Sequence, residues 1–409
     1  MRLIDSIGLE SIDFQSQSFF KELTLAYTDR KGSKKENLQE AEAIARLSAV
    51  VKHHTGLNVS FNIGDIDPSV HIPEVNRNHP LVNSFIRNYV SSSDGLAMIN
   101  QANGIARGTV SLKTGKVTGV FAEIKSTINM PWKMLSESKY SAEECAAITL
   151  HEVGHLFTYY EYIARSVTTN QVLAGLSKAL DGSGTIEARE AVLISAKKAL
   201  NLKALDAKEL AKSSNAKVAE IVVISNVVKE TESELGSNIY DFSSWEMLAD
   251  QYAARYHAGR HIVTALDKLY RGMFNISFRS MPAFLAMEAI KLTMLFLVPG
   301  IGILLMAMDG RGDGTYDAPG ARFKRVRNQI VEALKDGKLS KDDKDRLQAD
   351  LTTIDGIISE MEDRRQLVGI IWDAISPSAR KAANTERLQH DLEAIAANDL
   401  FVKAAQMRA

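Results

Sequence analysis

The sequence contains a single cysteine among its 409 residues, and this scarcity excludes an intramolecular disulfide. Cys145 lies six residues before His151, and on a helix that spacing points its thiol away from the face that carries the histidine. We therefore expect Cys145 to be a core thiol. A chain that folds without disulfides suits a reducing compartment, and we favour the cytoplasm over a location in a virion or at a membrane.

An excess of charge of either sign is also missing. The chain has 49 basic and 50 acidic residues and a net charge of -1, so no overall field draws in DNA, RNA or an anionic membrane surface. We do not expect nucleic acid as a partner. Residues 1–5 place charged side chains too close together for the apolar core of a signal peptide, so we do not expect export by that route.

One uncharged stretch, residues 292–308, raises the question of a membrane span. At about 1.5 Å per residue, these seventeen residues fall short of the roughly 30 Å hydrocarbon core of a bilayer. Pro299 also breaks a helix near the midpoint of the stretch. We therefore favour a buried pair of helices, and the alternative is a membrane-embedded hairpin within residues 283–308.

His151 and His155 stand four residues apart, with Glu152 directly after the first. Positions i and i+4 of a helix lie about 40° apart, so both imidazoles can face one metal ion. Glu152 is one step round the helix, where it can reach a water on that ion without ligating it. This spacing is typical of a zinc site.

The sequence around these histidines favours a helix. Ser141 with Glu144 three residues later forms the pattern of a capping box, and residues 142–164 contain no proline. The metal-free alternative is a buried helix in which both histidines are satisfied by hydrogen bonds.

A second stretch, near residue 246, offers a further ligand. A zinc ion held by two histidines needs a third protein ligand, and Glu246 can supply it while one position stays open for water. Asp250 lies one turn further along the same face, where it can accept the free N–H of a ligand imidazole and fix its tautomer. The alternative is that Ser243 and Glu246 form an ordinary capping box and that Asp250 is solvated.

The two stretches together resemble the HExxH…ExxAD pattern of M48-type gluzincin metallopeptidases, with about ninety residues between them. The resemblance covers roughly residues 105–330 and rests on these two motifs. It implies that His151, His155 and Glu246 bind zinc. It also implies that Glu152 is the catalytic base and that Asp250 supports a ligand imidazole.

The resemblance further suggests that residues 316–322 correspond to the family's downstream segment of proline and arginine near the active site. Residues 316–322 lack the histidine-proline dipeptide that is usual in that segment of the family. The transition-state donor is therefore left open among three candidates, namely Tyr316, His257 and Arg322.

We expect an α+β, mainly helical fold. It comprises an N-terminal arm over residues 1–37, a zincin-like metallopeptidase domain over residues 38–320 and a helical C-terminal extension over residues 321–409. The domain is expected to contain a helix over 38–54 that ends at Gly56, a strand over 57–63 and a helix over 79–90.

A β-hairpin is predicted from residues 108–112 and 117–121, running straight on to the histidine helix. It either forms the rim of a cleft and pairs with an extended substrate or only covers the core. In the C-terminal extension, apolar residues recur in a seam made of Leu347, Leu351, Ile354, Ile358 and Met361. Such a seam packs more often within its own chain than against a partner.

The sequence thus predicts a zinc-dependent endopeptidase that hydrolyses peptide bonds with metal-activated water, with Glu152 as general base and a protein or peptide as substrate. The alternative is a structural or assembly protein, for example of a viral particle, that retains a gluzincin scaffold. The arm and the charged C-terminal helices motivate this alternative, because peptide hydrolysis needs neither of them.

Overall fold

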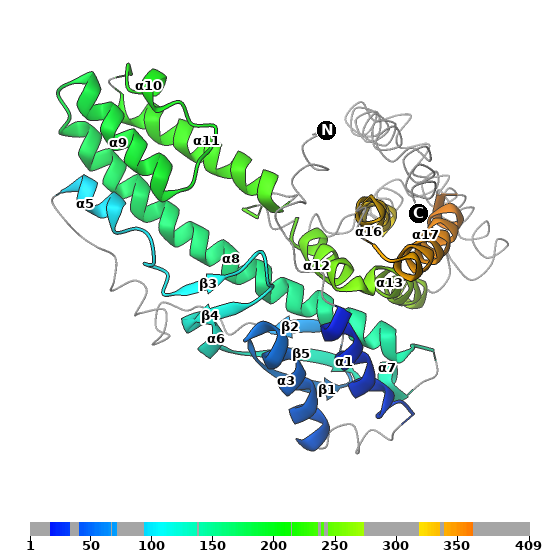
Figure 1. Ribbon diagram of the computed structural model, residues 1–409. Helices are drawn as coiled ribbons and strands as arrows, with labels where there is room; N and C mark the ends of the chain where they lie inside the picture. The colour runs from blue at the N-terminus through cyan, green and yellow to red at the C-terminus, as the bar shows by residue number, and fades with distance from the viewer. Residues whose placement is uncertain are drawn as a thin grey trace, which may run out of the picture. The chain divides into compact units, whose positions relative to one another are not determined.

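The computed structural model describes residues 17–32, 41–66, 68–71, 94–136, 139–213, 215–235, 239–240, 244–273, 319–335 and 339–362. Over these residues the chain is mainly helical with a small sheet and a hairpin, which confirms the predicted α+β, mainly helical class (Figure 1).

The chain divides into two compact units. The sheet unit comprises the described residues of 17–139 and 152–248, and the helical unit comprises those of 140–151 and 249–362. The division passes through two helices, α8 (Ala142–Asp181) after His151 and α12 (Trp245–Ala253) after Leu248. The predicted boundary after residue 37 lies outside the described residues, and the one after residue 320 falls in the first turn of helix α16 (Pro319–Leu334).

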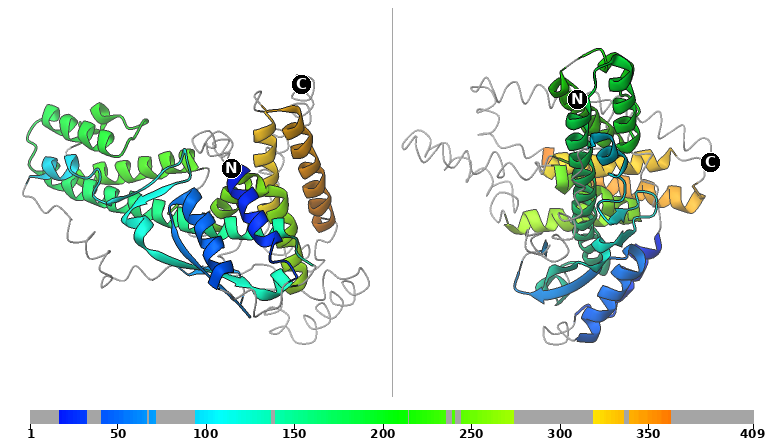
Figure 2. Two further views of the ribbon diagram at one scale, coloured as in Figure 1. Left: turned by 60° about the horizontal axis from the view of Figure 1, so that its bottom comes forward. Right: turned by 90° about the vertical axis from the view of Figure 1, so that its left-hand side faces the viewer.

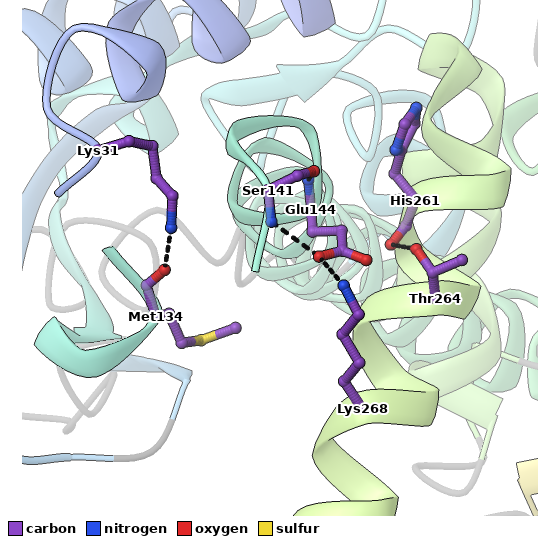
Figure 3. A network of polar contacts seen from close by, with 7 residues as sticks. All are labelled: Lys31, Met134, Ser141, Glu144, His261, Thr264 and Lys268. Carbon is purple, nitrogen blue, oxygen red and sulfur yellow. Dashed lines mark hydrogen bonds and ion pairs between the residues drawn. The ribbon is translucent and has the colours of Figure 1, made fainter. Parts of the chain in front are cut away.

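Helix α8 (Ala142–Asp181) carries both histidines of the motif and continues well past the predicted end near residue 164. The predicted capping box is confirmed, because Ser141 N–H donates to Oε2 of Glu144 at 2.8 Å and Glu144 N–H donates to Oγ of Ser141 at 3.2 Å (Figure 3). Lys268 of α13 (Gly259–Met273) donates to the same carboxylate oxygen at 2.7 Å. The single cysteine, Cys145, is fully buried in the first turn, as expected.

Ser141→Ala is expected to lower the free energy of unfolding by about 1 kcal/mol, because the variant leaves the Glu144 N–H without its capping oxygen. Chemical denaturation monitored by circular dichroism measures the change. Ser195→Ala serves as a control, since its exposed hydroxyl only donates back to the Ala191 carbonyl within a helix. A loss as large in the control as in Ser141→Ala would contradict the capping assignment.

The sheet unit is built on three strands in the order β1-β5-β2. They are β1 (Asn58–Gly64), β2 (Ser69–His71) and β5 (Lys125–Pro131), with β1 parallel and β2 antiparallel to β5. Helix α3 (Ala41–Thr55) precedes β1 and ends, as predicted, at Gly56, whose φ of 77° favours glycine. Helix α1 (Gln17–Thr28), from the predicted arm, packs against α3.

The predicted hairpin is confirmed as β3 (Gly108–Val110) paired antiparallel with β4 (Val117–Gly119). The expectation that it runs straight on to the histidine helix is wrong. Three elements intervene, which are α6 (Val120–Glu123), β5 and α7 (Trp132–Ser136). The strand that comes last before α8 is therefore β5, which lies between β1 and β2 in the described sheet and pairs with β2 over residues 127–129.

The rest of the sheet unit is a helical lobe around the C-terminal part of α8 (Figures 1 and 2). It contains α5 (Gly95–Asn100), α9 (Ile186–Ala199), α10 (Ala207–Leu210) and α11 (Ala216–Leu235). Glycines at the crossing let α5 approach α8 closely, since a Cβ on Gly95 would lie 2.3 Å from the carbonyl oxygen of Gly175. This contact explains why α8 tolerates a glycine in its interior.

The helical unit contains the C-terminal part of α12 (Trp245–Ala253), a π-helical turn η4 (Ala254–Ala258), α13 (Gly259–Met273), α16 and α17 (Lys341–Glu362). Helix α17 packs against α16 and α13 (Figure 2). Four seam residues, Leu347, Leu351, Ile354 and Ile358, are buried there. The seam therefore packs within the chain, as predicted.

Several predictions fall outside the described residues. They are the helix over residues 79–90, the uncharged stretch 292–308, Tyr316, and the C-terminal extension beyond residue 362. Among the helices that the structure describes, none is both long and apolar enough to cross a bilayer.

Candidate metal centre

The two histidines of the motif lie one turn apart on α8, as the sequence predicts. The capping box starts this helix ten residues before His151, so both histidines stand well inside regular helix, where their relative orientation is fixed. Glu152 is on the same turn and is buried. The motif is therefore presented by one rigid element.

Within the sheet unit, His155 faces the first turn of α12. Its Nε2 lies 3.4 Å from Oε1 of Glu246, and the two side chains are 15% and 16% exposed. The Ser243 of the alternative capping box lies outside the described residues. Glu246 therefore faces a motif histidine, as the third-ligand interpretation requires.

Within the helical unit, His151 faces Asp250. Its Nδ1 lies 2.9 Å from Oδ1 of Asp250. When Asp250 accepts the Nδ1–H, the lone pair of the ring is left on Nε2, the nitrogen that binds metal in such an arrangement. Asp250 is buried rather than solvated, so the structure disfavours the alternative interpretation of this residue.

Asp250 is itself held by Arg322 of α16. The guanidinium donates from Nε to Oδ2 and from Nη2 to Oδ1, both at 2.8 Å, and both side chains are almost completely buried. Burial alone would raise the pKa of Asp250, but the charge of Arg322 and the hydrogen bonds from His151 and Arg322 hold it well below its usual range. Asp250 is therefore a carboxylate at neutral pH.

The ligand atoms of His151, His155 and Glu246 come together. One ring nitrogen of each histidine and one carboxylate oxygen of Glu246 lie within 4.8 Å of one another. Ligand atoms of a tetrahedral zinc site, at about 2.1 Å from the metal, are about 3.4 Å apart. The distance of 3.4 Å from His155 to Glu246 matches this value. Two imidazoles and a carboxylate are also a donor set that zinc prefers, so these residues fit the metal.

The three candidates for the transition-state donor, Tyr316, Arg322 and His257, lie in different parts of the chain. Tyr316 lies outside the described residues. Arg322 directs two of its donors at Asp250, the partner of His151, and its side chain is almost completely buried. His257 lies in η4 with a φ of 64°, and its Nδ1 is 3.1 Å from Nη2 of Arg346 on α17.

The link from Arg322 to Asp250 was not predicted, although the sequence contains a signal for it. Arg322, Val326 and Ile330 are spaced by four residues and fall on one face of α16, which is buried. An arginine on the apolar face of a helix needs a buried anion, because an unpaired charge there is costly. The spacing cannot say which anion that is, and the partner is 72 residues away.

The chain was compared with models of protein families, with curated proteins and with solved structures, and no match was found in any of the three comparisons.

Proposed function

We propose that the protein is a zinc-dependent endopeptidase of the gluzincin type. The observation that supports the proposal best is the gathering of His151, His155 and Glu246 within 4.8 Å, on the two helices whose motifs resemble those of M48-type metallopeptidases. The pairing of His151 with Asp250 is a second support, since metal-binding histidines usually donate their other N–H to a carboxylate or carbonyl.

In the proposed reaction His151, His155 and Glu246 hold the metal. Bound zinc supplies Lewis acid chemistry, by which it polarises a carbonyl and lowers the pKa of a water molecule. Glu152 accepts a proton from the attacking water and passes it to the leaving amine nitrogen. The carbon–nitrogen bond breaks, and the water oxygen ends in the new carboxylate. Asp250 and Arg322 keep the ring of His151 in one orientation throughout.

Metal binding and cleavage should depend together on Glu246. Glu246→Ala removes a proposed metal ligand. Loss of a contact that only supports a ligand costs roughly 10–100-fold in metal affinity, so we expect the zinc affinity of Glu246→Ala to fall by more than that. Glu246→Asp keeps a carboxylate and should retain much of the zinc affinity. Zinc affinity is measured by chelator competition, and cleavage with an unfolded casein substrate. Glu187→Ala, at an exposed glutamate of α9, is the control.

Metal removal tests the same proposal in the unmodified chain. A strong chelator should abolish casein cleavage, and added zinc should restore it.

Equal zinc affinity in Glu246→Ala and Glu246→Asp would remove Glu246 from the site. Stoichiometric zinc with no cleavage of any peptide would instead favour the assembly protein that retains a gluzincin scaffold.

A further inference from the structure

Four aromatic side chains meet beside the His155–Glu246 pair in the sheet unit. Tyr162 contacts both Tyr240 and Trp245, with ring centroids 6.0 and 5.7 Å apart, and Tyr159 lies 6.2 Å from Trp245. All three ring pairs are T-shaped, which is the favourable edge-to-face arrangement. The four residues form one connected cluster of rings.

This ring cluster adjoins two of the proposed metal ligands. His155, Tyr159 and Tyr162 are at positions i, i+4 and i+7 of α8, within an arc of about 60°. Side chains on a helix lean toward its N-terminus, so Tyr159 leans over the turn that holds His155. On the facing helix, Trp245 directly precedes Glu246. The rings therefore extend along α8 from the place where the scissile bond of a substrate would lie.

The rings are held in place yet retain accessible surface. The indole N–H of Trp245 donates to the carbonyl of Ile239 at 2.9 Å, which fixes the ring. Tyr159, Tyr162 and Trp245 are each only partly buried. Their neighbour Tyr160 differs, since it is fully buried and stacks on Phe121 in the core. The three accessible rings are thus not explained by core packing alone.

The cluster presents an uncharged surface. Burial raises the pKa of Tyr159 to about 12, so its hydroxyl stays neutral. The charged side chains near Tyr240 bind one another, because Arg165 forms ion pairs with Glu161 and Glu234. Neutral, rigid aromatic rings of this kind gain most from contact with another large apolar group.

We propose that Tyr159, Tyr162 and Trp245 form a specificity surface for a large aromatic or aliphatic side chain next to the scissile bond of a peptide substrate. This inference rests on the proposed endopeptidase function and deepens it by naming the substrate class. The occupant is an apolar side chain because the rings supply apolar contact area, and it is adjacent to the scissile bond because Tyr159 and Trp245 adjoin His155 and Glu246.

The cleaved bond is first located by mass spectrometry of digested casein. The test then uses pairs of peptides that contain this bond and differ only in having Phe or Ala at one of the two positions that flank it. At one of these positions the wild type should cleave the Phe peptide with a kcat/KM about 10–100-fold higher than the Ala peptide. Tyr159→Leu and Trp245→Leu should each lower this ratio about tenfold or more. Because one protein sample cleaves both peptides, partial unfolding cancels from the ratio.

The control is Tyr160→Phe on the same helix, which should retain the ratio of the wild type. A ratio near one in the wild type at both positions, or an unchanged ratio in both leucine variants, overturns the specificity surface while the endopeptidase function stands.

Binding gives a readout that does not need turnover. Glu152→Gln should bind the Phe peptide about tenfold or more tightly than the Ala peptide in fluorescence anisotropy, and the added Trp245→Leu change should remove this preference. If no peptide is cleaved but this preference is found, the endopeptidase function fails and the aromatic surface stands. Equal binding of the two peptides overturns the surface.

Discussion

Glu152→Gln is expected to lower kcat/KM for peptide hydrolysis by at least about a hundredfold, because removal of a general base typically costs 10²–10⁴-fold. The amide has nearly the shape of the carboxylate but cannot take the proton of the attacking water. Since the proposed ligands are His151, His155 and Glu246, the variant should bind zinc with an affinity close to that of the wild type. A steady-state assay on a quenched fluorescent peptide, with zinc content measured on the same sample, checks both statements.

Glu143→Gln is a matched control for this loss. It makes the same chemical change on the same helix, nine residues before Glu152 and outside the metal cluster. We expect it to keep activity within a few-fold of the wild type. Activity that survives in Glu152→Gln would rule out Glu152 as the base, and zinc loss in that variant would instead show that the residue supports the metal.

The parts of the site that follow local rules were the ones that the sequence could predict. The capping box of Ser141 and Glu144 and the four-residue spacing of the histidines involve neighbours along one helix, where geometry follows from the helical repeat. Strand β1 was predicted for a similar reason, since apolar and polar residues alternate along it and the apolar ones are buried.

Other parts of the fold and of the site depend on contacts between residues that are far apart in the sequence, which local patterns do not predict. Strand β5 was missed because it mixes Ser126 with Ile128 and Met130 on its buried face, which weakens the alternation of apolar and polar residues. The crossing of α5 and the C-terminal part of α8 brings Gly95 against Gly175, eighty residues later in the sequence. The ring cluster likewise joins α8 to residues about eighty positions later, so the spacing of Tyr159 and Tyr162 alone predicted no site.

Asp250→Asn is expected to destabilise the fold by about 3–5 kcal/mol, because it leaves the buried guanidinium of Arg322 without its anion. It should also weaken zinc binding by about 10–100-fold, since an amide holds the Nδ1–H of His151 less strongly than a carboxylate. Urea unfolding and chelator competition measure the two effects. Asp355→Asn is a matched control, because Asp355 pairs with Arg327 in the same unit but is 46% exposed, and its loss should cost about 1 kcal/mol or less.

The two effects of Asp250 can be separated with a double variant. Asp250→Asn combined with Arg322→Met buries no unpaired charge, so we expect it to recover much of the lost stability, as buried ion pairs replaced by apolar groups often do. Zinc affinity should stay low, because the carboxylate behind His151 is still missing. If zinc affinity recovered together with stability, Asp250 would act on the metal site only through folding.

The pH dependence of stability gives an independent check on the same ion pair. The pKa of Asp250 is lower in the folded chain than the value of about 3.9 of an unperturbed aspartate, so its contribution to stability is fully present above that pH. The contribution is lost as the pH falls from about 4 toward the folded pKa, because the unfolded chain then binds a proton that the folded chain does not. The stability gap between wild type and Asp250→Asn should therefore be constant from pH 5 to 7 and should narrow below about pH 4. A gap that stays constant down to pH 2 would show that Asp250 is not held as a buried carboxylate by Arg322.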